Sequence, residues 1–185
     1  MRPHESTCSS GAPVSTRRRP ALLVALTLAM SVAIAASACA DPEPRNLGSL
    51  VQREGRYLDP DDFRPYTGPV FSTFRDEQDA VEMTARLVDG RLHGPYERFY
   101  RDGSVFGRGA YRDGAWDGPF ESFYRDGTLW MEGRYEGGSL DGPYVAYAED
   151  GTVQERGTYV ADAPCGTWIR EGEEEAHPDC PEEGG

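Results

Sequence analysis

Seven aspartate-glycine pairs are the first feature that could carry chemistry, because closely spaced carboxylates can ligate calcium. Calcium needs several oxygen ligands that converge on one point, and the spacing of these pairs does not match the nonapeptide repeats that bind it. Asp-Gly is also typical of tight hairpin turns, since glycine adopts positive φ and the aspartate side chain can bond the turn backbone. We therefore predict turns, with no metal or other cofactor, at Asp89, Asp102, Asp113, Asp117, Asp126, Asp141 and Asp150.

Aromatic side chains are the second candidate, because rings in register offer flat apolar area and tyrosine adds a polar group. Such a surface could bind a carbohydrate or a peptide, although most of the rings are expected to form the core. We predict that Tyr100, Tyr124 and Trp130 stay exposed and are the best candidates for a binding site.

Two of the four cysteines are candidates for a disulfide. Cys8 lies within an N-terminal export signal and Cys39 directly follows it, which leaves Cys165 and Cys180 in an oxidising compartment, where thiols usually pair. Closing this loop would contribute about 3 kcal/mol and hold the tail against the last strand as an edge cap. The rival interpretation is a metal site formed by Glu173, Glu174, Glu175, His177, Asp179 and Cys180.

Catalysis finds little support among the remaining residues. His93 and His177 are the two histidines after the export signal, and neither stands beside a nucleophile motif. Carboxylates are plentiful but lie in expected turns or polar runs, whereas a glycan hydrolase needs a carboxyl with a raised pKa in a cleft. We expect no catalytic residues and no enzyme activity.

A 24-residue repeat positions most of these side chains, and three glycine series and four apolar series recur in phase. The glycines are Gly94, Gly118, Gly142 and Gly166; Gly103, Gly127 and Gly151; and Gly109, Gly133 and Gly157. The apolar series are Tyr96, Phe120, Tyr144 and Trp168; Phe99, Phe123 and Tyr147; Val105, Leu129 and Val153; and Tyr111, Tyr135 and Tyr159. A degenerate copy begins at Gly68-Pro69, which stands 26 residues before Gly94-Pro95, as a two-residue insertion would explain.

Each unit contains two short runs rich in aromatic and β-branched residues between Asp-Gly turns, which predicts a β-hairpin. The glycine inside the second run, Gly109 or its counterpart, indicates either a bulge or a close side-chain crossing. Hairpins stacked in order would form an all-β, single-layer, curved antiparallel β-meander in which each unit contacts its neighbours. In-phase aromatic ladders must then serve as the core.

The unit from Gly94 to Gly103, repeated from Gly118 to Gly127 and from Gly142 to Gly151, resembles the MORN repeat variant family. The resemblance covers residues 57–169 and rests on the Gly-Pro-aromatic, aromatic-aromatic and Asp-Gly elements. Members are bacterial and often labelled antitoxin components of toxin-antitoxin systems. The resemblance implies the hairpin-repeat fold and brings no family catalytic residues with it.

The N-terminus is typical of a lipoprotein signal peptide, since three arginines precede an apolar run and then the small residues Ala36-Ser37-Ala38 before Cys39. We predict a signal peptide over residues 1–38, a lipid such as diacylglycerol with palmitate on Cys39, and a membrane attachment through it. A transmembrane anchor and ordinary secretion are the alternatives. We predict a flexible tether over 39–56, the repeat domain over 57–169 and an acidic tail over 170–185.

Beyond the leader, 15 arginines face 31 acidic residues, a formal charge of −16. Such a charge disfavours nucleic acid and anionic lipid headgroups as partners, and it favours basic partners, cations or simple solubility. We therefore expect an envelope lipoprotein that acts as a non-catalytic repeat module binding or scaffolding another envelope or secreted protein. An envelope immunity or antitoxin-type protein that neutralises a toxin, and an enzyme acting on cell-wall glycan, are the competing functions.

Overall fold

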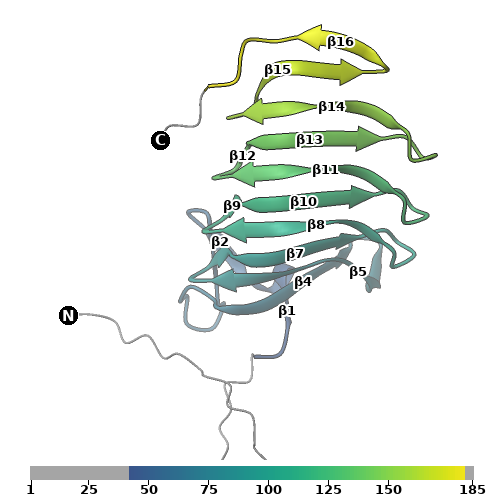
Figure 1. The fold of residues 1–185 in the computed structure, drawn as a ribbon. Coiled ribbons are helices and arrows are strands. Elements are labelled where there is room, and N and C mark those ends of the chain that lie inside the picture. Colours follow the sequence, from purple (N-terminus) through teal and green to yellow (C-terminus); the bar gives the residue numbers. More distant parts are fainter. Residues whose placement is uncertain (1–41, 182–185) are drawn as a thin grey trace, which may run out of the picture. The chain divides into compact units, whose positions relative to one another are not determined.

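The computed structural model describes residues 42–181, and most of them belong to one open antiparallel sheet (Figure 1). This part of the chain contains a single 3-10 turn and no α-helix, so the predicted all-β fold is confirmed. Among the same residues, none forms a helix long and apolar enough to cross a bilayer. Cys8, Cys39 and the predicted signal peptide lie outside the described residues.

The main sheet is a meander, because its long strands pair in the order in which they follow one another along the chain. Each repeat supplies one hairpin. The hairpin strands are β4 (Gly68–Phe74) with β5 (Glu77–Val88), β7 (Gly94–Phe99) with β8 (Val105–Arg112), β10 (Gly118–Phe123) with β11 (Leu129–Glu136), and β13 (Gly142–Tyr147) with β14 (Val153–Val160). The last pair is β15 (Ala163–Arg170) with β16 (Glu173–Ala176).

Short strands connect consecutive hairpins, and each pairs with the end of the strand before it. These are β6 (Arg91–Leu92), β9 (Ala115–Trp116) and β12 (Ser139–Leu140). The turn after the second strand of the next hairpin then donates a hydrogen bond back to this short strand. The bonds run from Gly114 N, after β8, to Leu92 O at 2.8 Å, and from Gly138 N, after β11, to Trp116 O at 2.8 Å. One such bond therefore recurs every 24 residues and links each unit to the next.

The two broad faces of the sheet differ in chemistry. We call the face that carries the rings of the Tyr96 and Tyr111 series the ring face, and the opposite face the proline face. The ring face holds Tyr96, Tyr111, Trp116, Phe120, Tyr135, Tyr144, Tyr159 and Trp168. The proline face holds Pro95, Pro119 and Pro143 with the row Glu97, Arg108, Glu121, Glu132, Val145, Arg156 and Ile169.

The internal glycine of each unit allows a side-chain crossing, and only the last of them, Gly157, also lies at a register shift, in the pairing of β14 with β15. Each lies directly opposite an aromatic residue, as Gly109 does opposite Tyr96. A Cβ on Gly109 would stand 2.7 Å from Cζ3 of Trp116, and one on Gly133 would stand 2.8 Å from Cε1 of Phe120. Within the hairpins the register shifts occur elsewhere, at the turn end of the first strand, for example between Arg98 and Phe99.

The degenerate first unit is the β4–β5 hairpin. Its pairing shifts register twice, on either side of Thr73, whereas the following three hairpins each shift once. The additional irregularity agrees with the two-residue insertion predicted from the spacing of Gly68 and Gly94.

The segment predicted as a flexible tether is ordered from Arg45 onwards, so that prediction is wrong for residues 45–56. β1 (Arg45–Asn46) pairs in parallel with β4, a 3-10 turn follows at Leu47–Ser49, and β2 (Val51–Arg53) pairs with β3 (Arg56–Leu58). Leu50 is buried with Tyr66, Val70 and Leu87 in a small apolar core at this end of the sheet. Because these contacts join distant parts of the chain, no local periodicity in the sequence predicted them.

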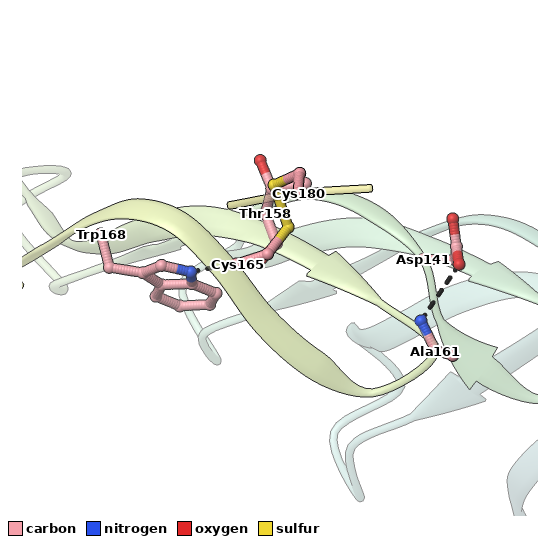
Figure 2. Close-up of a disulfide and its surroundings, with 6 residues drawn as sticks. All are labelled: Asp141, Thr158, Ala161, Cys165, Trp168 and Cys180. Carbon is pink, nitrogen blue, oxygen red and sulfur yellow. Dashed lines mark hydrogen bonds between the residues drawn. A yellow bond between two sulfur atoms is a disulfide. The ribbon is translucent and has the colours of Figure 1, made fainter. Parts of the chain in front are cut away.

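The C-terminal end is closed by the tail, where the predicted disulfide is present between Cys165 and Cys180 (Figure 2). The predicted edge cap is confirmed, since β16 pairs with β15 and the backbone of His177 and Pro178 bonds Gly166. Beneath this cap Trp168 is fully buried, and its Nε1 donates to Thr158 O at 3.2 Å. The described part of the acidic tail, up to residue 181, therefore lies against the last long strand.

Candidate binding surface

The three rings predicted as a binding site lie together near the hairpin ends, but none is fully exposed. Tyr100 packs edge to face on Phe106, with ring centroids 5.3 Å apart, and Trp130 lies 6.2 Å from Phe106 and 6.0 Å from Tyr124. All are half-buried. The expectation that they stay exposed is wrong, because Tyr100 packs on Phe106, and Trp130 packs on both Phe106 and Tyr124.

The tyrosine hydroxyls of this cluster link successive units. Tyr100 donates to the carbonyl of Phe123 at 2.8 Å, and Tyr124 donates to the carbonyl of Tyr147 at 2.7 Å. Burial, and then the nearby carboxylates of Glu149 and Asp150, raise the pKa of Tyr124. Sequence spacing did not reveal these bonds, which give both tyrosines a structural role; their role in binding stays a prediction.

Five of the seven Asp-Gly pairs lie in turns, as predicted, whereas Asp117 and Asp141 lie in the short links before β10 and β13, where the prediction is wrong. Asp102, Asp126 and Asp150 each accept a hydrogen bond from the backbone N–H two residues later, at 2.9 to 3.0 Å. The pKa of Asp102 is lowered chiefly by the Ser104 hydroxyl and that of Asp126 chiefly by the Thr128 backbone N–H. Across residues 42–181, no three His, Cys, Asp or Glu side chains gather in a way that could hold a metal ion.

Neighbouring turns are also joined by ion pairs at two steps of the sheet. Arg101 bonds Asp76 at 2.8 Å, and Arg125 bonds Asp102 at 3.1 Å. Glu149 occupies the position of Arg101 and Arg125 in the next unit, so the series of turn-to-turn ion pairs does not continue there. These exposed pairs contribute little stability individually, but they fix adjacent turns in register.

The acidic tail does not form the rival metal site. Cys180 is bonded to Cys165 and has no thiolate to offer, and the ring of His177 packs edge to face on Trp168 with centroids 6.0 Å apart. Glu173, Glu174 and Glu175 lie on exposed β16, where Glu175 pairs with Arg170 at 2.8 Å. Asp179 is exposed.

On the ring face the rings pack on one another, and of the eight rings named there Trp168 is fully buried and the other seven are half-buried. Trp116 lies 4.2 Å from Tyr111 and 5.1 Å from Tyr96 between centroids, and Phe120 lies 4.9 Å from Tyr135. Burial, followed by the neighbouring Tyr96, raises the pKa of Tyr111 to about 12. Trp116 was missed as a member of the ladder, although it stands in phase with Leu92 and Leu140 in the sequence.

The proline face is a better candidate for contact with another molecule. Each Gly-Pro pair at the start of a hairpin places an exposed proline on it, and open hollows follow one another between these prolines. The first lies between Pro95 and Pro119, the second between Pro119 and Pro143, and a third extends from Pro143 to Ile169. Their linings combine proline and aliphatic surface with the long side chains of glutamate and arginine.

A family comparison agrees with this geometry, since the MORN repeat variant matches residues 116–136 and 140–161. The chain carries MORN repeat variants. The two matched segments run from β9 to β11 and from β12 to β14, and the same hairpin geometry extends over the preceding units. A MORN repeat array of this kind is consistent with a repeat module that binds proteins.

Other comparisons add little. No curated protein matches the sequence. Among solved structures, one that is similar is a crystal structure of a TarM mutant from S. aureus in complex with Fondaparinux, alpha-GlcNAc-glycerol and UDP. It is 16% identical, with a TM-score of 0.34, and the match covers 64% of this chain and 21% of that chain. A similarity this low carries no inference about the function of the MORN repeats.

Proposed function

We propose that this protein is an envelope-anchored, non-catalytic repeat module that binds or scaffolds another protein. The observation that carries the proposal is that both ends of the sheet are covered by the chain whereas the proline face is not. Both ends are covered by the chain itself, with β1 and the Leu50 core at one end and β16 with the disulfide at the other. The proline face carries recurrent hollows and is covered by no other segment among residues 42–181.

A binding role also fits the titration of the carboxyl groups. Among residues 42–181 the carboxyls with shifted pKa are Asp59, Asp76, Asp102, Asp126 and Asp150, and each pKa is lowered by hydrogen bonds in turns or to arginine. A glycan-cleaving enzyme requires the opposite, a carboxyl held protonated by burial. This supports a surface that holds a partner without chemistry.

Envelope anchoring rests on the small residues before Cys39 and on the disulfide, which is typical of proteins outside the cytoplasm. Only residues 40–44 separate Cys39 from β1, which at ~3.3 Å per residue allows a link of roughly 17 Å. An acylated Cys39 would hold the repeat sheet closer to the membrane surface than a long tether would.

Anchoring is tested by labelling cells with palmitate and recovering the protein. The wild-type chain and a Cys8→Ser control should carry the label, and Cys39→Ser should carry none and leave the membrane fraction. Label that persists in Cys39→Ser would contradict the proposal, as would its absence from the wild type.

Protein binding is tested with a photo-crosslinking amino acid placed in the full-length chain in cells. A crosslinker at Glu121, on the proline face, should give a discrete protein adduct, and one at Glu54, in the exposed β2–β3 turn, should give none. If the adduct is a secreted toxin, the function is immunity; an adduct with a glycan strand, or equal products from both positions, would refute protein binding through this face.

A further inference from the structure

Two arginines on the proline face have guanidinium groups with no ion-pair or hydrogen-bond partner among residues 42–181. They are Arg134 on β11 and Arg156 on β14, and both are exposed. Most other arginines of the repeat sheet are paired, for example Arg98 with Glu82 at 3.0 Å and Arg170 with Glu155 at 2.7 Å. Unpaired cations are unexpected on a chain whose formal charge beyond the leader is −16.

The repeat itself provides the control for Arg156. Arg108 occupies the equivalent position two units earlier, where its cross-strand neighbours are Glu97 and Glu121, and it bonds Glu121 at 2.5 Å. The cross-strand neighbours of Arg156 are Val145 and Ile169. The substitution of aliphatic residues for both acids leaves the guanidinium of Arg156 without an internal partner.

Arg134 also departs from the repeat, but here the arginine itself is the residue that differs. Its counterparts in the flanking units are Ala110 and Thr158, and its cross-strand neighbour is Pro119. Arg134 lines the hollow between Pro119 and Pro143, and Arg156 lines the next hollow, which starts at Pro143. Pro143 and Val145 belong to both linings, so one continuous apolar strip lies between the two cations.

We propose that this strip, which we call the Pro143 surface, binds a partner segment with an apolar side chain flanked by two carboxylates. The proposal rests on the proposed protein-binding function and specifies its partner. Arginine binds carboxylate through a planar pair of hydrogen bonds, and the strip of Pro143 and Val145 contributes apolar area between the two charges. Arg134 and Arg156 lie two strands apart, about 10 Å across the sheet, and are offset by two residues, about 7 Å, along it. The diagonal of roughly 12 Å suits acids three or four residues apart in an extended peptide.

The charge of the remaining surface favours a short acidic peptide over a phosphate or sulfate polymer. A polyanion would run past the pair of arginines onto a surface with about two acids for each arginine. Its long-range repulsion would exceed the attraction of two exposed cations. A segment with two carboxylates can be held by the arginines alone.

The first test selects peptides from a displayed random nine-residue library with the full-length protein. Selected peptides should contain two acids around an apolar residue. Their affinity, measured by fluorescence anisotropy, should fall about fivefold in Arg134→Gln or Arg156→Gln and more than tenfold in the double variant. Arg75→Gln is the matched control, because Arg75 is also unpaired but lies in the β4–β5 turn.

Selected peptides without acidic residues, or equal affinities in the double variant and the control, would overturn the proposal. Far-UV circular dichroism of each variant verifies that the sheet is intact. Failure here alongside a specific adduct at Glu121 in cells would refute only the Pro143 surface, whereas loss of both would refute protein binding through this face.

The second test uses the absence of lysine from the sequence. Arg156→Lys introduces the only lysine side chain, so a carbodiimide crosslink between its amine and a carboxylate can be assigned by mass spectrometry. The product should join Lys at this position to an acid of the selected peptide. A crosslink to Glu182 or Glu183 of the same chain, in the presence of the peptide, would show that the occupant is internal and would overturn the proposal.

Discussion

The indole ring of Trp168 lies against Gly157 so closely that a Cβ on this glycine would overlap the ring. Gly157 is the last member of the internal glycine series, and Trp168 is the buried residue over which the C-terminal cap closes. The pair shows why the repeat keeps a glycine there: the ring of the next unit occupies the space of a side chain.

We expect substitution of these glycines by alanine to destabilise the sheet most where the least space is available for the new Cβ. Gly157→Ala should cost more than about 3 kcal/mol, and Gly109→Ala and Gly133→Ala about 2 kcal/mol. Gly107→Ala is the control, since its Cβ would stand 3.2 Å from the nearest atoms, and it should cost about 1 kcal/mol. Urea unfolding measures these differences, and equal losses at Gly107 and Gly157 would contradict the crossing as the reason.

Removing the disulfide should release the C-terminal cap. We expect Cys180→Ser to lower the free energy of unfolding by about 3 kcal/mol, because the unfolded chain gains the entropy of an open loop. Hydrogen exchange should accelerate in β16 and at Gly166, while β7 and β8 keep the protection of the wild type. Uniform acceleration across the sheet would show that the cap is not a separate unit.

The tyrosine bonds between units should each contribute modestly. Tyr100→Phe and Tyr124→Phe remove donors to the carbonyls of Phe123 and Tyr147, and each should cost about 1 kcal/mol. Tyr159→Phe is a matched control, because the Tyr159 hydroxyl has no hydrogen-bond partner among residues 42–181. Thermal unfolding that fails to separate the three variants would refute this assignment.

The turn aspartates should make stability depend on pH in the acid range. Their folded pKa lies below the ordinary value of an aspartate, so their contribution to stability is full above that ordinary value and is lost as pH falls through the folded pKa. Asp102→Asn combined with Asp126→Asn and Asp150→Asn keeps an acceptor in each turn but removes the titration. Urea midpoints between pH 7 and about 2 should fall less steeply for this variant, and parallel curves would contradict the prediction.

The N-terminal core should be essential to the first hairpin. We expect Leu50→Ala to cost about 2 to 4 kcal/mol, because Leu50 packs with Tyr66, Val70 and Leu87. Gln52→Ala, an exposed change in β2, should cost less than about 0.5 kcal/mol. Similar losses from the two variants in denaturant unfolding would show that residues 45–56 act as the tether first predicted.

The repeat region was predictable because its information is periodic. Glycines and rings in phase at 24 residues predicted hairpins, turns and strand order, and Cys165 stood out because other units place histidine or aspartate at its position. The N-terminal cap could not be predicted, since Leu47 and Leu50 follow no period and contact residues far along the chain.

The candidate binding residues were predicted less well, for a related reason. Spacing places Tyr100 and Tyr124 in each hairpin but does not show that their hydroxyls reach carbonyls 23 residues away. Arg134 was overlooked because it breaks the repeat, and Arg156 because its cross-strand neighbours do. Their significance depends on cross-strand neighbours, which only the register reveals.

The backbone bond from Gly114 to Leu92 is repeated from Gly138 to Trp116, so successive inner units are linked by the same backbone contact. A gene duplication that added one unit of 24 residues would lengthen the sheet by roughly 10 Å and leave both caps in place. Duplication can therefore lengthen this protein in fixed steps of one repeat. Each added repeat brings its own proline and its own charged residues to the proline face.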